Sequence, residues 1–285
     1  MIKESHLESY TITLTTQSPV YVGSNVCLKK TEFCYYPKIQ KVLFLDRDKF
    51  LAFLIEKNLM DKYEQFIFSE KGNLALFMQD LGYGYTEMSR LKLYSVDAGD
   101  ALDEKRSIKD IHCFMRNQKN QAYIPGSSLK GALRTVLLTK MIADGTYPYA
   151  MDINMGRKDG GKIIERNYFN TLTLSEKKKN DILNDIMRTV SISDSKTIDN
   201  SDMILCSKLD VAPNGLTRKL NVVRECVKPG VKIGFALTID KSFGRFISVD
   251  EIRSSISAFS NYYNREYLRY FPSAKTAGAL SNSIY

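Results

Sequence analysis

The chain contains no tryptophan and only two histidines, and its five cysteines are too far apart to form a CxxC pair. Zinc sites in proteins are built from cysteine and histidine at short spacings, so a zinc centre is not expected. Scattered cysteines in odd number are typical of reduced thiols in a cytoplasmic protein. We therefore expect no bound metal and no cofactor.

Long apolar stretches are also missing. No run approaches the roughly 18 residues that a membrane span needs, and the opening residues MIKESHLESY are too polar for a signal peptide. Hydrophobic residues make up 44% of the 285 positions, which is ordinary for a globular protein with a buried core. These features predict a protein that makes no contact with a membrane.

Positive charge is in excess. The chain has 41 Lys and Arg against 32 Asp and Glu, which gives a net charge of +9. Because no strongly basic amphipathic helix stands out, the excess favours a nucleic-acid partner over a membrane surface. A basic surface without a polyanionic partner is the alternative. The 17 Tyr and 14 Phe include candidates for stacking on bases, although most of them must fill the core.

Hydrophobic periodicity predicts both strands and helices. Alternating β-branched residues predict a strand within 10–22, a hairpin over 33–45 and later strands at 190–196, 203–211, 217–227 and 230–240. Helical spacing predicts a helix capped by Asp46, a short helix at 73–82, one after Gly126 and a long one at 249–271. Residues 83–107 have no clear period and are predicted to be a surface insertion.

The order of these elements is similar in the two halves of the chain. Strand, helix, paired strands and helix follow one another, without a strict alternation of strand and helix. This order favours an α+β fold with two tandem ferredoxin-like domains, at 1–144 and 190–285. The Gly- and Lys-rich stretch 145–189 between them is predicted to be a flexible insertion or linker.

The stretch YIPGSSLKGALRT (123–135) is the most distinctive segment. Pro125 and Gly126 favour a turn, and Ser127 or Ser128 can cap the helix that follows. The amides of such a turn and the hydroxyls of both serines suit a bound phosphate. A plain helix cap is the alternative interpretation.

Lys130 and Arg134 lie four residues apart near the start of that helix. No Asp or Glu occurs between Gly126 and Ile142 to offset their charge, and the positive end of a helix dipole disfavours cations. A bound phosphate would satisfy both side chains. The segment is not an NTPase P-loop, because its lysine precedes Gly131 and no Ser or Thr follows that glycine.

The loop YIPGSSLKGALRT resembles the signature loop of the RAMP superfamily, the RNA-binding backbone subunits of type III CRISPR effector complexes. SPVYVGS (18–24) resembles the family's first strand and the glycine after it. ISDSK (192–196) and VVREC (222–226) resemble the RAMP subunit at the 3′ end of the guide RNA in type III-A complexes. The resemblance covers roughly residues 18–285.

Two positions depart from the family pattern. Tyr21 stands where histidine is frequent, so no role of that histidine is transferred. The family usually has a second glycine-rich loop after a segment like SNSIY, but this chain stops at Tyr285. We therefore expect that a C-terminal portion is missing from the sequence.

The resemblance implies a non-catalytic subunit that binds guide RNA, caps its 3′ end and is needed for complex assembly and 3′ maturation. The implied partners are the guide RNA, a neighbouring RAMP subunit and the small helical subunit, with indirect contact to target RNA; recruitment of trimming nucleases is left open. The expected RNA-contact residues are Gly23, Ser24, Gly126, Ser127, Ser128, Lys130, Gly131, Arg134, Lys196, Arg218 and Arg224.

An enzymatic function is the alternative. Some RAMP proteins cut CRISPR RNA without metal through a histidine, and His112 is the candidate here, although its apolar surroundings favour a core or groove residue. His6 lies in an N-terminus that we expect to be frayed. Asp194 and Asp199 are candidates for carboxylate-driven cleavage, but neither has a partner at a spacing typical of acid–base chemistry. We expect no catalytic residue.

Overall fold

The computed structural model describes residues 6–69, 73–99, 101–102, 110–145, 160–175, 181–212 and 216–268. The chain forms two compact units, each built from separate stretches. Unit 1 combines Met1–Leu14, Ile124–Lys196 and Ile233–Tyr285, and unit 2 combines Thr15–Tyr123 and Thr197–Lys232.

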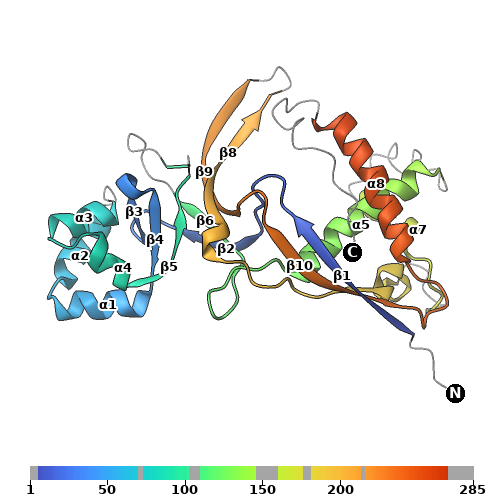
Figure 1. Cartoon of the computed structure of the whole chain (residues 1–285), viewed down its shortest axis with the longest axis horizontal. Helices are drawn as coiled ribbons and strands as arrows, with labels where there is room; N and C mark the ends of the chain where they lie inside the picture. Colours follow the sequence, from blue (N-terminus) through green and yellow to red (C-terminus); the bar gives the residue numbers. More distant parts are fainter. Residues whose placement is uncertain are drawn as a thin grey trace. The chain divides into compact units, whose positions relative to one another are not determined.

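Unit 1 contains a three-stranded sheet of order β1-β10-β7, in which β10 pairs antiparallel with β7. Helices α5 and α8 lie side by side (Figure 1). Helix α8 begins with a capping box, in which the Glu251 N–H donates to Ser248 Oγ (3.1 Å) and the Ser248 N–H donates to the Glu251 carboxylate (2.9 Å). The elements are β1 (Leu7–Thr15), α5 (Gly126–Ala143), α7 (Gly160–Phe169), β7 (Val190–Ile192), β10 (Lys232–Asp240) and α8 (Val249–Glu266).

Unit 2 contains a seven-stranded sheet of order β2-β6-β9-β8-β5-β4-β3. Helices α1 to α4 gather beside its β3–β4 end (Figure 1). The strands are β2 (Gly23–Leu28), β3 (Phe33–Tyr36), β4 (Lys41–Leu45), β5 (Lys92–Asp97), β6 (Ile111–Phe114), β8 (Met203–Val211) and β9 (Thr217–Val227). The helices of unit 2 are α1 (Arg47–Glu56), α2 (Met60–Phe68), α3 (Leu74–Asp80) and α4 (Tyr85–Arg90). Across both units, short 3-10 turns occur at Pro37–Ile39, Ile182–Asn184, Ile186–Thr189 and Asn200–Asp202.

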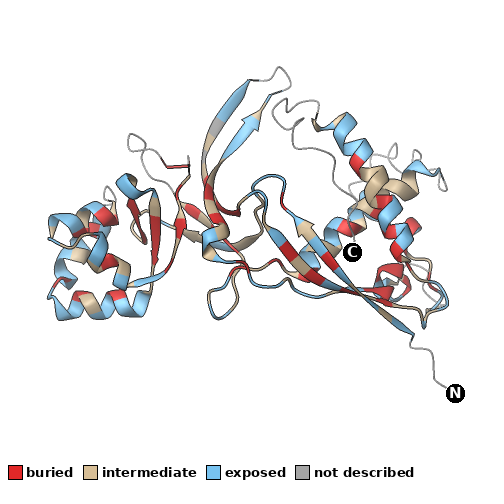
Figure 2. Cartoon of the chain, in the orientation of Figure 1, coloured by how far each residue is buried: buried red, intermediate tan, exposed pale blue. Residues whose placement is uncertain are grey.

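The helices of unit 2 follow from local sequence signals. Asp46 caps α1, because its carboxylate accepts the Lys49 N–H at 3.2 Å, and Phe50 and Leu54 then turn the same face of α1 inward. Asn73 caps α3 through the Ala75 N–H at 2.9 Å. Figure 2 shows the result: buried residues line the inner faces of these helices and the strands beside them, while the outer helix faces are exposed.

Several predicted elements are confirmed. The hairpin over 33–45 is β3 and β4, and the strands predicted at 203–211 and 217–227 are β8 and β9. The α+β class is confirmed as well. The tandem ferredoxin-like arrangement stays a prediction, and so does the division at 144 and 190. Each observed sheet takes strands from both sides of those boundaries.

Two stretches are more ordered than their composition predicts. The interpretation of 83–107 as a surface insertion is wrong for α4 and β5, because Met88, Tyr94 and Val96 are buried and β5 is an inner strand of the sheet. Within 145–189, predicted to be a linker, helix α7 buries Ile164 and Phe169. Tertiary packing outweighs weak local periodicity in both stretches.

In the part of the chain that the structure describes, no helix is long and apolar enough to cross a membrane. The five cysteines are free thiols. The cytoplasmic location expected from them stays a prediction.

Candidate RNA-contact surfaces

Helix α5 begins at Gly126, directly after Pro125. A Cβ at position 126 would lie 2.2 Å from the carbonyl oxygen of Ile192 and 2.5 Å from that of Ser193. No real Cβ approaches backbone oxygen that closely, so the helix can start here only with glycine. The glycine is required for close packing against the end of β7.

The segment ISDSK holds the start of α5 in place. The Gly126 N–H donates to Asp194 Oδ1 at 2.9 Å, and the Ile124 N–H donates to Ser195 Oγ at 2.9 Å. The Ser195 N–H returns a bond to the Ile124 carbonyl at 3.0 Å. Lys196 follows with an exposed side chain, and its N–H donates to the Gly234 carbonyl on β10 at 3.0 Å.

The predicted serine cap is wrong. Ser127 and Ser128 lie inside the first turn of α5 rather than before it, and the position before the helix is occupied by Pro125, which has no side-chain donor or acceptor. Asp194 takes over the capping role from outside the helix. Both serine side chains are exposed, and the Ser127 N–H makes no hydrogen bond within the described residues. These groups are therefore open to a ligand.

Lys130 is a half-buried cation on the same turn. It forms no ion pair with any residue that the structure describes. Burial lowers the pKa of its ammonium group; the charges of Arg134 and Arg188 act in the same direction, while the Asp185 carboxylate opposes them. A cation in this environment gains from a nearby anion.

Arg134 has two acidic partners, contrary to the expectation that its charge is not offset. Its guanidinium donates to Asp185 at 2.7 Å and to Glu165 at 3.1 Å, and it lies 4.0 Å from the centre of the Phe169 ring. These partners come from α7 and from the turn after it, outside the helix that the sequence argument covered. Arg134 therefore joins α5 to α7, and its charge does not require a phosphate. Gly131 lies on the exposed side of α5, where an added Cβ would meet nothing within 4 Å outside its own helix backbone.

In unit 2, Gly23 and Ser24 begin β2. A Cβ at position 23 would lie 2.5 Å from the hydroxyl of Tyr21, so the glycine makes room for that ring. Ser24 donates its hydroxyl to the Cys113 carbonyl on β6 at 3.2 Å. Both residues thus have structural functions in addition to the predicted RNA contact.

The two basic residues predicted on β9 lie in different surroundings. Arg224 is half-buried on the sheet, and its guanidinium carbon is 4.8 Å from the centre of the Tyr21 ring. Arg218 is exposed and faces Asp210 across the β8–β9 hairpin, which Figure 1 shows as a long two-stranded arm.

A buried ion pair in unit 2 was missed by the sequence analysis. Glu225 is fully buried and accepts hydrogen bonds from the Arg116 guanidinium and from the Phe114 N–H at 2.9 Å. The Arg116 guanidinium carbon lies 3.5 Å from the centre of the Tyr94 ring. The signal was the acid in VVREC, which alternates with Val223 on one face of the strand, since a buried charge requires a partner.

The residues considered for catalysis are dispersed. His112 is half-buried on β6, with its Nε2 4.0 Å from Cys27 Sγ, and it forms no hydrogen bond to a carboxylate among the described residues. Asp194 caps α5, and Asp199 caps a 3-10 turn through the Ser201 N–H at 2.8 Å. Within the described ranges no three His, Cys, Asp or Glu side chains are grouped as a metal site requires.

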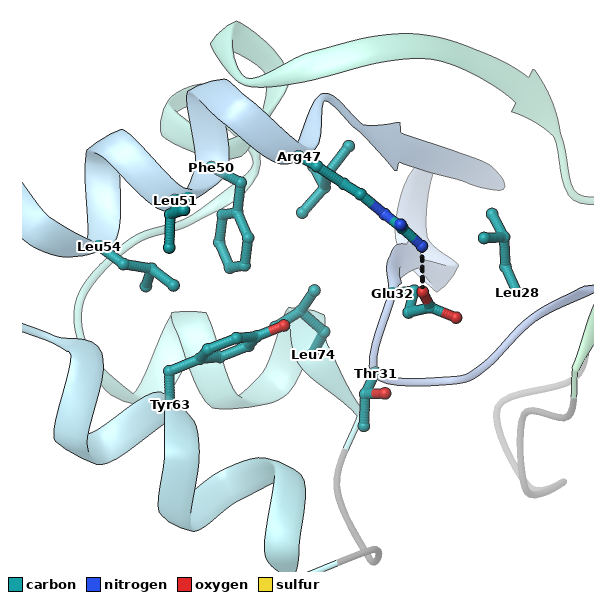
Figure 3. Close-up of a pocket in the computed structure, with 10 residues that line it drawn as sticks. Leu28, Thr31, Glu32, Arg47, Phe50, Leu51, Leu54, Tyr63 and Leu74 are labelled. Atoms are coloured by element: carbon teal, nitrogen blue, oxygen red, sulfur yellow. Dashed lines mark hydrogen bonds and ion pairs between the residues drawn. The ribbon is translucent and has the colours of Figure 1, made fainter.

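An apolar pocket of about 270 Å³ lies between α1, α2, α3 and the loop that joins β2 to β3 (Figure 3). Leu54, Tyr63 and Leu74 point into it. At its rim Arg47 donates to Glu32 at 2.8 Å. The charges of this pair cancel, so the pocket offers nothing to attract a polyanion.

The sequence model of the RAMP superfamily matches residues 13–271, which include the α5 loop, the ISDSK segment and β9. The chain belongs to the RAMP superfamily. The resemblance predicted from the glycine-rich loop is thereby confirmed.

Curated relatives of this RAMP chain carry the name CRISPR system Cms protein Csm5. The protein of Streptococcus thermophilus is 30% identical over 97% of this chain and 76% of its own length. Those of Mycobacterium tuberculosis (strain CDC 1551 / Oshkosh) and Enterococcus italicus are 24% and 23% identical, over 84% and 91% of this chain and 68% and 67% of their own lengths.

Solved structures with a similar fold include the crystal structure of T. onnurineus Csm5, with a TM-score of 0.71 and 17% identity over 93% of this chain and 83% of that one. A chain in the cryo-EM structure of a type III-A Csm–crRNA–target RNA ternary complex has a TM-score of 0.70 and 17% identity, covering 95% of this chain and 80% of that one. These similarities support the RAMP fold.

The RAMP residues predicted to contact RNA fall into two groups. Unit 1 brings the first turns of α5 next to the ISDSK segment, and unit 2 places Gly23 and Ser24 on the same sheet as Arg224. In unit 1 the strongest candidates are Ser127, Ser128 and Lys130, whose side-chain polar groups make no hydrogen bond or ion pair with any residue that the structure describes.

Proposed function

We propose that this protein is a non-catalytic guide-RNA-binding subunit of a type III-A CRISPR complex. It occupies the terminal position at the 3′ end of the guide and is needed for assembly and 3′ maturation in antiviral defence. Its neighbours are a RAMP backbone subunit and the small helical subunit, and it meets target RNA indirectly. Contact with trimming nucleases stays an open part of this proposal.

The observation that carries the proposal is the first turn of α5 in a chain related to Csm5. Ser127 and Ser128 are exposed at the positive end of the helix dipole, and Lys130 beside them is a half-buried cation without an acidic partner among the described residues. Helix N-termini with such groups bind phosphate. The net charge of +9 supports a polyanionic ligand.

Purification of the natural complex through a tag on this protein tests the role. We expect guide RNAs in the eluate, and digestion with a 3′-to-5′ exonuclease should be slower in complexes that contain the protein than in complexes that lack it. Lys130→Gln should reduce the amount of protein in the complex, whereas Lys49→Gln on the exposed side of α1 removes the same charge and should not. Guides of normal length that resist the exonuclease equally well in complexes lacking the protein would contradict the terminal position.

The ribonuclease function remains the alternative, because His112 is half-exposed and lies beside Cys27. The pure protein should leave labelled precursor RNA intact with and without divalent metal. Cleavage that disappears in His112→Ala would establish the enzymatic function instead.

A further inference from the structure

Four adjacent strands of unit 2 place one polar row across the sheet. Cys27 on β2 pairs with His112 on β6, His112 pairs with Arg224 on β9, and Arg224 pairs with Cys206 on β8. Side chains of directly paired residues point to the same face of a sheet. These four side chains, here called the polar row, therefore share one face and span roughly 14 Å, three inter-strand spacings.

The polar row is on the open face. All four of its residues are half-buried, whereas the neighbouring residues on β6, β8 and β9, Ile111, Leu205 and Val223, are at most 5% exposed. Because neighbours along a strand point to opposite faces, these apolar residues lie on the core side and the polar row lies on the other, partly exposed side, where Phe114 and Cys226 are buried next to it.

Tyr21 extends the polar row on one side. The backbone of Val20 bonds to that of Val227, with N–H to oxygen distances of 3.1 and 2.8 Å, which fixes the segment before β2 against β9. The Tyr21 ring then lies 4.8 Å from the Arg224 guanidinium, and Gly23 leaves the space that its hydroxyl occupies. The backbone thus places an aromatic ring beside a cation.

Arg224 forms no ion pair in the part of the chain that the structure describes. Its sequence neighbour Glu225 points to the other face and pairs with Arg116. A guanidinium on an open sheet, flanked by a phenol ring and an imidazole, matches a nucleotide: arginine binds phosphate through two parallel N–H bonds, and aromatic rings and guanidinium groups stack on bases.

We propose that the polar row and Tyr21 bind one nucleotide of single-stranded RNA, with its phosphate on Arg224 and its base against the rings of Tyr21 and His112. This second contact rests on the proposed RNA-binding function and adds a site in unit 2 to the one at α5. His112 acts here as a base-contacting residue, not as an acid or base.

Binding of fluorescein-labelled oligouridine to the purified full chain, measured by anisotropy at several salt concentrations, tests the site. Arg224→Gln should weaken binding about tenfold and lower the slope of log K against log salt by about 0.7, the value for one phosphate contact on a single strand. Lys49→Gln should change the affinity by less than about twofold. Irradiation with 5-iodouridine RNA should cross-link the peptide that contains Tyr21 or His112.

The wild-type protein supplies a second readout that does not depend on the folding of a variant. Oligouridine should slow the alkylation of Cys27 and Cys206 several-fold, because both thiols belong to the polar row. Polyglutamate at the same charge concentration should not. Protection by polyglutamate alone would indicate an acidic protein partner and overturn the proposal.

The outcomes separate this site from the proposed function. If the wild-type protein binds no RNA, the proposed function itself fails. If the wild-type protein binds RNA and Lys130→Gln weakens that binding, the proposed function holds. If in that case Arg224→Gln binds RNA as Lys49→Gln does, and neither cross-links nor thiol protection are found, only the site on the polar row is wrong.

Discussion

The Gly126 N–H donates to the Asp194 carboxylate, so the helix that is proposed to hold a guide-RNA phosphate already has a negative charge at its N-terminus. Asp194→Asn keeps an oxygen acceptor for this bond and removes the charge. The free energy of unfolding should fall by less than about 1 kcal/mol, the usual contribution of an acid to a helix dipole. RNA binding should become a few-fold tighter, because a like charge beside the phosphate is lost. Anisotropy titrations at low salt check this, and unchanged affinity would place the phosphate elsewhere.

The two glycines of the α5 loop should respond to alanine in opposite ways. Gly126→Ala forces a Cβ into two carbonyl oxygens and should destabilise the protein by about 1–3 kcal/mol. Gly131→Ala adds a methyl group in open space and improves helix propensity, so stability should rise by about 0.5–1 kcal/mol. Thermal melts measure both changes. A loss of RNA binding in the more stable Gly131→Ala would show that RNA backbone approaches this glycine closely.

Substitutions at Lys130 and Arg134 should have different effects on RNA binding and on the stability of the fold. Arg134→Gln leaves Asp185, a mostly buried carboxylate, without its cation, and should cost about 1–3 kcal/mol of stability. Lys130→Gln removes a half-buried charge that forms no ion pair with the described residues and whose burial lowers its pKa, so stability should hold or rise while RNA affinity falls. Urea unfolding and RNA titration of both variants decide between these roles. Equal losses of stability would contradict the assignment.

Glu225 and Arg224 are sequence neighbours with opposite expected effects. Glu225→Ala leaves the Arg116 guanidinium buried without a counter-charge and should destabilise the protein by about 3–5 kcal/mol. Arg224→Gln changes only the open face of the sheet and should melt within a few degrees of the wild type. A melt of Glu225→Ala close to that of the wild type would mean that water reaches Arg116.

The cysteines offer a chemical test of the burial pattern. Burial raises the pKa of the Cys34 thiol and of the Cys113 thiol to about 12, so at pH 8 almost none of either is present as the reactive thiolate. The half-exposed Cys27 and Cys206 should therefore be alkylated first by iodoacetamide, and the buried Cys34, Cys113 and Cys226 only on unfolding. Mass spectrometry of partially alkylated protein gives the order. Early modification of Cys34 would contradict its place in the core.

The sequence predicts elements where the signal is local. Asp46 caps α1 through the Lys49 N–H, Phe50 and Leu54 are spaced one helical turn apart on its buried face, and the first four residues of β8 alternate between buried and half-buried, so these elements follow from local signals. Helix α4 and strand β5 were missed because their burial depends on strands and helices that are distant in the chain.

The candidate site was only partly predictable for the same reason. The composition of the α5 loop indicates an anion, but the acids that occupy two of its groups, Asp194 and Asp185, come from other segments. The polar row is likewise invisible in the sequence, because the register of four separate strands creates it. Arg224 was singled out as an RNA contact and His112 as a catalytic candidate, but nothing in the sequence placed the two side by side.

The interleaving of the two units bears on how the protein folds during synthesis. Strand β10 is the central strand of the unit 1 sheet, yet it begins at Lys232, and β1 ends at Thr15. Strand β1 must therefore wait for β10, with all of unit 2 in between. Such long-range pairing is slow and leaves a strand edge exposed in the meantime. Truncated translation products that end before β10 should consequently be bound by chaperones through β1.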